Sequence, residues 1–181
     1  KRCKIGVMRG DIFGKARAKK AALRYNHPSR NVRLVLIAGD YGATTTALYF
    51  GELLREAGET VAVFTPRKSH INGESYAHAY DASADAIQRA ISKSRKSATT
   101  VVMAATPALL RSHALETLQC EMTILTSDGE LAREIAEHPA AFVVLPETMS
   151  SESLNVSPHQ MISFGDSELA ASLSHHEIYR H

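Results

Sequence analysis

The chain has 181 residues and a mass of 19.7 kDa, enough for one ordinary domain with a buried core. Hydrophobic and charged fractions of 44% and 22% are typical of globular proteins, and no long apolar run or signal peptide indicates a membrane span or secretion. Cys3 and Cys120 are too few for a disulfide framework, so we expect a cytoplasmic protein. The chain starts at Lys1 rather than Met, so we expect either a fragment of a longer protein or a trimmed chain.

Positive charge is concentrated at the start of the chain. Residues 1–33 contain eleven lysines and arginines against the single acid Asp11, so they carry +10 while the remaining residues carry −8. We therefore expect a basic N-terminal arm or helix at 1–32 and an α/β domain at 33–181. A solvated or self-docking arm is favoured by roughly two to one over one that contacts an anionic surface. Nucleic acid is the weaker partner, because no interleaved aromatic residues suggest stacking on bases.

The first third of the chain predicts a helix, a buried strand and a second helix. The basic helix spans Ile12 to Tyr25, and His27-Pro28 ends it. Leu34 to Ala38 is a continuous apolar run, as in a strand that is buried on both faces of a parallel sheet. The helix that follows ends at Gly58. Its apolar face consists of Ala47, Phe50, Leu54 and Ala57.

A glycine loop joins this first strand to its helix. Strand, glycine loop and helix N-terminus form the layout of a phosphate-binding loop, in which backbone N–H groups face an anion. Such a loop carries a lysine before its first threonine to meet the β- and γ-phosphates, and here that residue is Ala43. The candidate phosphate-binding residues are Gly39, Asp40, Tyr41, Gly42, Ala43, Thr44, Thr45 and Thr46.

Strands and helices alternate through the rest of the chain. Strands are expected at 60–64, 99–104, 122–125, 141–145, 161–164 and 172–179. Helices are expected at 82–94, from Pro107 through Leu118, and at 128–137, with a loop or small hairpin at 65–80. This alternation indicates an α/β fold: a three-layer αβα sandwich with a mostly parallel sheet. Ligands of such sheets bind beyond the carboxyl ends of the strands, where 39–46 lies.

The sequence resembles the central ATPase domain of the Mur ligases, with a P-loop NTPase-like fold. His27-Pro28-Ser29-Arg30, the strand and the loop carry the likeness, which is strongest to the UDP-N-acetylmuramyl-tripeptide synthetase type. The family loop reads Gly-Thr-Asn-Gly-Lys-Thr-Thr-Thr, so the glycines and threonines match while Asp40, Tyr41 and Ala43 depart from it. The likeness covers about residues 27–181 and includes neither the uridine-binding nor the amino-acid-binding domain.

Three further family positions fall on this sequence. The strand that ends at Ala104 resembles a family strand that ends in a magnesium-binding glutamate, and Ala104 stands at the position of that glutamate. Thr106 matches the serine or threonine that follows in the family. His113 matches a histidine of the following helix, whose arginine is replaced by Ala114. Active members also carry a carbamylated lysine that helps to bind a second magnesium, and this chain has no lysine after Lys96.

The resemblance implies ATP-dependent addition of an amino acid to a UDP-MurNAc-peptide through an acyl phosphate. Phosphoryl transfer depends on charge neutralisation at the β- and γ-phosphates, and each lost stabilising group costs a factor of roughly 10²–10³. We therefore favour a catalytically silent, Mur-ligase-like domain in peptidoglycan metabolism, with binding of ATP and Mg weakened and no catalytic or metal residue assigned. The alternatives are an active ligase that is completed by another chain and a nucleotide-binding regulatory module. A homodimer or another cell-wall protein is the expected partner.

Other candidate sites are weaker. Histidines at 175, 176 and 181 are expected on the surface rather than around a metal, because neighbours on a strand face opposite sides. Cys120 is expected at the edge of the core with no acid–base partner. Ser150-Ser151 is expected in a turn, and no nucleophile is assigned there.

Overall fold

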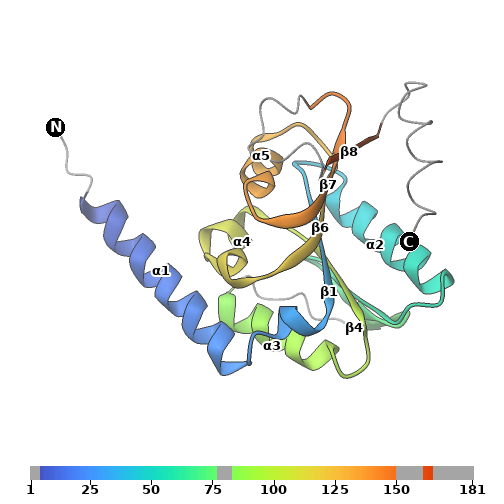
Figure 1. The fold of residues 1–181 in the computed structure, drawn as a ribbon, viewed down its shortest axis with the longest axis horizontal. Coiled ribbons are helices and arrows are strands. Elements are labelled where there is room, and N and C mark those ends of the chain that lie inside the picture. The colour runs from blue at the N-terminus through green and yellow to red at the C-terminus, as the bar shows by residue number, and fades with distance from the viewer. Residues whose placement is uncertain (1–4, 77–82, 150–160, 165–181) are drawn as a thin grey trace.

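The structure is a computed structural model that describes residues 5–76, 83–149 and 161–164, with side chains from Ile12 onward except that of Tyr76. Figure 1 shows a twisted sheet with helices packed around it. The helices are α1 (Ile5–Arg24), α2 (Ala43–Glu56), α3 (Ala84–Ser94), α4 (Pro107–Arg111) and α5 (Glu130–Ala136), with 3₁₀ turns η1 (Pro28–Asn31) and η2 (Ala114–Thr117). The strands are β1 (Arg33–Ala38), β2 (Val61–Phe64), β3 (Ser69–Ile71), β4 (Glu74–Tyr76), β5 (Thr100–Ala104), β6 (Cys120–Leu125), β7 (Ala140–Pro146) and β8 (Met161–Phe164).

The strands form one sheet in the order β4-β3-β2-β5-β1-β6-β7-β8. β1 lies between β5 and β6 and is parallel to both, and β2, β7 and β8 extend the parallel part. β3 and β4 are antiparallel and form a hairpin, which is the second of the two alternatives predicted for 65–80. Asn72 and Gly73 occupy its turn with positive φ angles of 51° and 88°, as a tight hairpin turn requires.

The two faces of the sheet bury different sets of helices. Val35, Ile37 and their neighbours form one apolar cluster that packs against α2. The opposite face, which includes Leu34 and Leu36, forms a larger cluster with apolar residues of α1, α3, α4, η2 and α5. The side chains alternate because successive strand residues point to opposite faces. The predicted three-layer αβα sandwich with a mostly parallel sheet is therefore confirmed.

The basic N-terminal helix is longer than predicted, since α1 begins at Ile5. It packs against α3 and η2. Its inward face consists of small residues: Gly14, Ala18, Ala21 and Ala22. Gly14 lies so close to the ring of His113 that a Cβ atom there would overlap it. The domain boundary predicted at residue 33 stays a prediction.

The single helix predicted from Pro107 through Leu118 is wrong. α4 ends at Arg111, and His113 adopts a left-handed conformation with φ of 55° before the 3₁₀ turn η2 begins at Ala114. The reversal turns Leu115 into the core, where it is 2% exposed. The strand predicted at 172–179, the C-terminal histidines and Ser150-Ser151 lie outside the described residues.

Candidate functional site

The loop between β1 and α2 has the geometry of a tight turn into a helix. Gly42 is the N-cap of α2, with φ of 81° in the left-handed region that glycine adopts without steric cost. Because its N-cap is a glycine, no side chain caps the first N–H groups of α2. Gly39 is buried, and a Cβ atom there would overlap the Thr126 hydroxyl and lie 2.9 Å from Ser127 Oγ.

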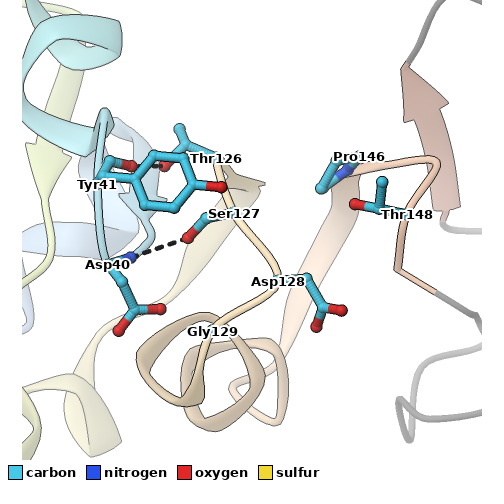
Figure 2. A pocket seen from close by; sticks show the side chains of 8 residues that line it. All are labelled: Asp40, Tyr41, Thr126, Ser127, Asp128, Gly129, Pro146 and Thr148. Carbon is cyan, nitrogen blue, oxygen red and sulfur yellow. Dashed lines mark hydrogen bonds between the residues drawn. The ribbon is translucent and has the colours of Figure 1, made fainter.

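Residues that follow β6 hold this loop in place (Figure 2). The Thr126 hydroxyl donates to the carbonyl of Tyr41 at 2.7 Å, and the Thr126 N–H donates to the carbonyl of Ala38 at 2.8 Å. The backbone N–H of Asp40 donates to Ser127 Oγ at 2.9 Å. Two adjacent strands therefore end in loops that are bonded to each other, which fixes the path of the glycine loop.

A cleft of about 200 Å³ lies beside these loops, at the carboxyl ends of β1, β6 and β7. Its lining residues are Asp40, Tyr41, Thr126, Ser127, Asp128, Gly129, Pro146 and Thr148. Two of the eight candidate loop residues are in this lining, whereas those from Gly42 to Thr46 are not. The cleft is smaller than the roughly 300–1,000 Å³ of ordinary small-molecule sites. Its lining contains two carboxylates and no lysine or arginine, which is unfavourable for a triphosphate.

The two carboxylates of the cleft have different surroundings. Arg133 pairs with Asp128 at 2.7 Å and neutralises it locally. Asp40 is exposed and forms no ion pair with any residue that the structure describes. Its carboxylate lies against Gly129, the N-cap of α5, where a Cβ atom would overlap it. Asp40 thus brings negative charge to the edge of the glycine loop.

The residues at two of the predicted family positions are buried together. Ala43 is 7% exposed at the start of α2, and Ala104 is 1% exposed at the end of β5. Both belong to the apolar cluster between α2 and the sheet, with Ile37 and Ala47 among its other members. Neither position presents a polar group to the cleft.

Two other predicted positions have structural roles in the fold. Thr106 is the N-cap of α4, and its hydroxyl accepts from the Leu109 N–H at 3.3 Å. His113 lies against α1, and its Nδ1 is 2.8 Å from Glu116 Oε1. His113 does not line the cleft, and the structure therefore does not bring it together with the glycine loop.

The donor set provides a poor site for a magnesium ion. Mg²⁺ prefers one or two carboxylates together with substrate phosphates, and Asp40 and Asp128 are the carboxylates of the cleft. Asp128 already bonds to Arg133, and Ala104 has no ligand atom in its side chain. Within the described ranges, no group of three or more His, Cys, Asp or Glu is placed to hold a metal ion. These residues do not fit a tightly held magnesium–triphosphate.

Sequence reasoning missed the second half of the cleft. Thr126, Ser127, Thr148 and their neighbours follow β6 and β7, and nothing in their residue types indicates a site. The signal that would have found them is the sheet order, because β6 lies directly beside β1. Burial raises the pKa of the Cys120 thiol to about 12 and so disfavours the reactive thiolate, and Cys120 packs against the edge of the core as predicted.

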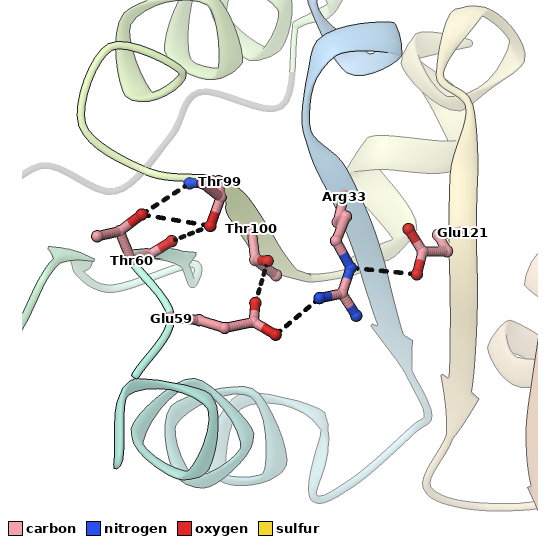
Figure 3. Close-up of polar contacts among 6 residues, drawn as sticks. All are labelled: Arg33, Glu59, Thr60, Thr99, Thr100 and Glu121. Carbon is pink, nitrogen blue, oxygen red and sulfur yellow. Dashed lines mark hydrogen bonds and ion pairs between the residues drawn. The ribbon is translucent and has the colours of Figure 1, made fainter. Parts of the chain in front are cut away.

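At the opposite ends of the strands, polar groups form a closed network (Figure 3). Arg33, at the start of β1, pairs with Glu59 at 2.7 Å and with Glu121 at 3.2 Å. The buried hydroxyl of Thr100 donates to the other oxygen of Glu59. Burial by itself lowers the pKa of Arg33, but Glu121 and Glu59 raise it overall. Each charged side chain of this network therefore has a partner within it.

Comparisons with known proteins agree on the fold. No protein-family model and no curated protein sequence matches this chain. Among solved structures, it is similar to a UDP-N-acetylmuramoyl-L-alanyl-D-glutamate–2,6-diaminopimelate ligase, with a TM-score of 0.66 and 16% identity over 82% of this chain and 36% of that one. It is also similar to E. coli FolC in complex with DHPP and ADP, with a TM-score of 0.58 and 13% identity over 83% of this chain and 46% of that one. MurF from Acinetobacter baumannii is similar with a TM-score of 0.57 and 14% identity over 85% of this chain and 35% of that one.

These likenesses concern the architecture. The chain spans between about a third and a half of the length of each of these three proteins. All three identities lie well below 25%, and they therefore support no transfer of activity or substrate. What the chain shares with them is the overall fold, at TM-scores of 0.57 to 0.66. Its fold is that of the Mur ligase central domain, which the folylpolyglutamate synthases also have.

Proposed function

We propose that this domain is a catalytically silent relative of the Mur ligases, which acts by binding and serves peptidoglycan precursor metabolism. The sequence resemblance and the shared fold relate it to ATP-dependent ligases. Its partner is a second copy of the chain or another cell-wall protein. The proposal depends on the residues that stand where the family places its charged groups.

The burial of Ala43 and Ala104 carries the proposal. The resemblance aligns these positions with the loop lysine and the magnesium-binding glutamate, and both are packed in the apolar cluster under α2. No lysine follows Lys96 to serve as the carbamate. Removing one preorganised stabilising group costs a factor of roughly 10²–10³. With three such groups missing, even strong non-additivity leaves little phosphoryl transfer.

ATP turnover tests this proposal directly. The purified chain, incubated with ATP, magnesium and a UDP-MurNAc-peptide acceptor plus an amino acid, should release ADP at the background rate. The Asp40→Asn variant, prepared identically, controls for a contaminating ATPase, because contamination gives both preparations the same rate. Accumulation of ligated product at ordinary enzyme rates, about 10 s⁻¹, would refute silence and support an active ligase instead.

A nucleotide-binding regulatory module is the second candidate. The left-handed Gly42 and the uncapped N-terminus of α2 support it, because together they present backbone N–H groups and the positive end of a helix dipole. Asp40 opposes an anion there, and removing one charge at about 4 Å in water is worth ~1 kcal/mol, or about fivefold in affinity.

Calorimetry separates the two candidates. Under the silent-domain proposal, ATP and UDP-MurNAc give neither heat nor a shift of the melting temperature. Binding of either ligand without hydrolysis, tightened about fivefold in Asp40→Asn, would favour the regulatory module. Glu56→Gln, which removes a charge at the other end of α2, is the matched control and should leave the affinity unchanged.

A further inference from the structure

The outward face of α1 combines two kinds of side chain that rarely share an exposed helix surface. Ile12, Phe13 and Leu23 are large apolar residues that are 64%, 64% and 69% exposed. Arg17 and Lys20 are exposed beside them and, with Phe13 and Ala16, line a shallow hollow. Apolar side chains that are exposed together with basic ones on one helix face are typical of a surface that another molecule covers.

The helix is attached to the body in a way that leaves this face open. Its inward side consists of glycine and alanines, which let α1 lie close to α3 and η2. Lys15 pairs with Glu116 at 3.4 Å, and Arg24 pairs with Asp85 at 2.7 Å. Because the small residues pack into the core, the large apolar residues of α1 face outward. In Figure 1 the N-terminal half of α1 extends beyond the rest of the fold.

The apolar residues form a stripe along the helix. Ile12, Ala16 and Leu23 recur at spacings of four and seven residues, which places them on one side of an α-helix. Basic residues flank the stripe: Lys19 on one side, and Arg17 and Lys20 on the other. None of these three forms an ion pair with any part of the chain that the structure describes. The surface therefore offers apolar area and uncompensated positive charge together.

We propose that α1 is a docking surface for an anionic lipid bilayer, on which the helix lies parallel to the membrane plane. A bilayer interface accepts apolar side chains at the boundary of the headgroups and acyl chains, and it supplies the negative charge for the flanking lysines and arginines. The long basic side chains can reach the headgroups while their stems cover apolar surface. A nucleic acid would satisfy the charges and leave Ile12 and Leu23 exposed to water.

The charge of the rest of the chain does not prevent this orientation. Residues 34–181 carry −8, but exposed charges more than about 10 Å apart are largely screened at ordinary salt. A helix in contact with the membrane therefore acts through its own charges. In the sequence, Lys1, Arg2, Lys4 and Arg9 precede Ile12, together with the single acid Asp11. None of the described helices is long and apolar enough to cross a bilayer, so α1 would lie on the surface.

Co-sedimentation with vesicles tests the proposal. The chain should bind phosphatidylcholine vesicles that contain about a quarter phosphatidylserine, and it should bind pure phosphatidylcholine far more weakly. Arg17→Gln/Lys20→Gln should reduce binding about 25-fold, at about fivefold per charge. Arg67→Gln/Lys68→Gln removes the same charge from exposed residues between β2 and β3 and should leave binding unchanged.

The apolar stripe is tested separately. Ile12→Ser/Leu23→Ser should weaken vesicle binding about 100-fold, while Tyr49→Ser/Leu53→Ser, at exposed positions on α2, should not. The chain contains no tryptophan, so Phe13→Trp provides a single reporter whose emission should shift to the blue on anionic vesicles. Tyr49→Trp should show no shift. All substituted positions are exposed, and circular dichroism verifies that each variant is folded.

Three results would overturn the proposal. The first is failure of the chain to bind anionic vesicles at low salt. The second is equal loss of binding in the α1 variants and their controls, which would assign binding to net charge alone. The third is tight binding to polyuridylate, reduced in Arg17→Gln/Lys20→Gln, without vesicle binding, which would identify α1 as a nucleic-acid surface. None of these results bears on ATP turnover, so the proposal stands apart from the proposed function.

Discussion

The two ends of the parallel sheet differ in whether their charged side chains are paired. At the amino ends, Arg33 pairs with both Glu59 and Glu121, and the Thr100 hydroxyl donates to the second carboxylate oxygen of Glu59 (Figure 3). At the carboxyl ends, Asp40 borders a cleft whose lining has no lysine or arginine (Figure 2). The amino end is a closed network, whereas the carboxyl end is held by hydrogen bonds between loops.

This difference separates what stabilises the fold from what remains available to a ligand. Charges that are already paired contribute modestly to stability and have little left for a partner. The carboxyl end keeps its shape through Gly39, Gly42 and the Thr126 hydroxyl, and none of these supplies a positive charge. This chain therefore has the loop geometry of a phosphate site, but the charged side chains beside the loop are carboxylates, which repel a phosphate.

The largest effect is expected where backbones approach most closely at the carboxyl end. Gly39→Ala should lower the free energy of unfolding by about 2–3 kcal/mol, because its Cβ would overlap the Thr126 hydroxyl. Urea denaturation measures the loss. Adding Thr126→Ala should recover part of it, and additive losses in this double-mutant cycle would contradict the steric explanation.

A smaller loss is expected at Gly42, for a different reason. Around its Cβ position the nearest atoms are 3.6 Å away, so alanine would fit sterically. Its φ of 81° is nevertheless unfavourable for any side chain, and Gly42→Ala should cost about 1–2 kcal/mol. Gly42→Asn should cost less, since asparagine tolerates the left-handed region better. Equal losses for the two variants would point to packing instead of backbone strain.

At the amino end we expect a modest effect that depends on salt. Arg33 is half-exposed, so Arg33→Gln should lower the free energy of unfolding by roughly 0.5–1 kcal/mol. High salt should reduce this difference, because it screens the ion pairs. Gly39→Ala, measured in parallel, should show no such salt dependence. If the two variants respond alike to salt, the contrast between the two ends of the sheet fails.

The smallest effect is expected in mild acid, at groups outside both the Arg33 network and the cleft. Burial by itself raises the pKa of Glu116, but the hydrogen bond with His113 and the charge of Lys15 lower it overall from the usual 4.5. Its contribution is therefore present above that value and is lost as the pH falls through the folded-state pKa.

His138 should act in the same direction at higher pH. Burial lowers its pKa below the usual 6.5, against the smaller opposing effect of Glu116. Its neutral form therefore stabilises the fold above pH 6.5, and this contribution is lost as the pH falls through the lowered pKa. Melting temperatures recorded from pH 7 to pH 4 should decline, and His138→Gln should flatten the upper part of that curve. An unchanged curve in His138→Gln would contradict this assignment.

Local patterns in the sequence were enough to predict most of the fold. The apolar run at Leu34–Ala38, the glycine loop and the helix spacing after it predicted β1, the turn and α2 within a residue or two. Such features are local because hydrophobic period and glycine conformation act over a few residues. The end of the helix at His113 could not be predicted from local patterns. The ring of His113 packs against Gly14 of the distant helix α1 and bonds to Glu116, and the contact with α1 depends on the tertiary structure.

By itself, the sequence determined the fold class, the position of the glycine loop and the absence of lysine beyond Lys96. Only the tertiary structure decided that the residues after β6 hold that loop and that Ala43 and Ala104 share one apolar cluster. It also decided that the large apolar side chains of α1 point away from the core. The reason is physical: propensity and periodicity belong to single segments, whereas strand order and helix rotation depend on which distant surfaces pack together.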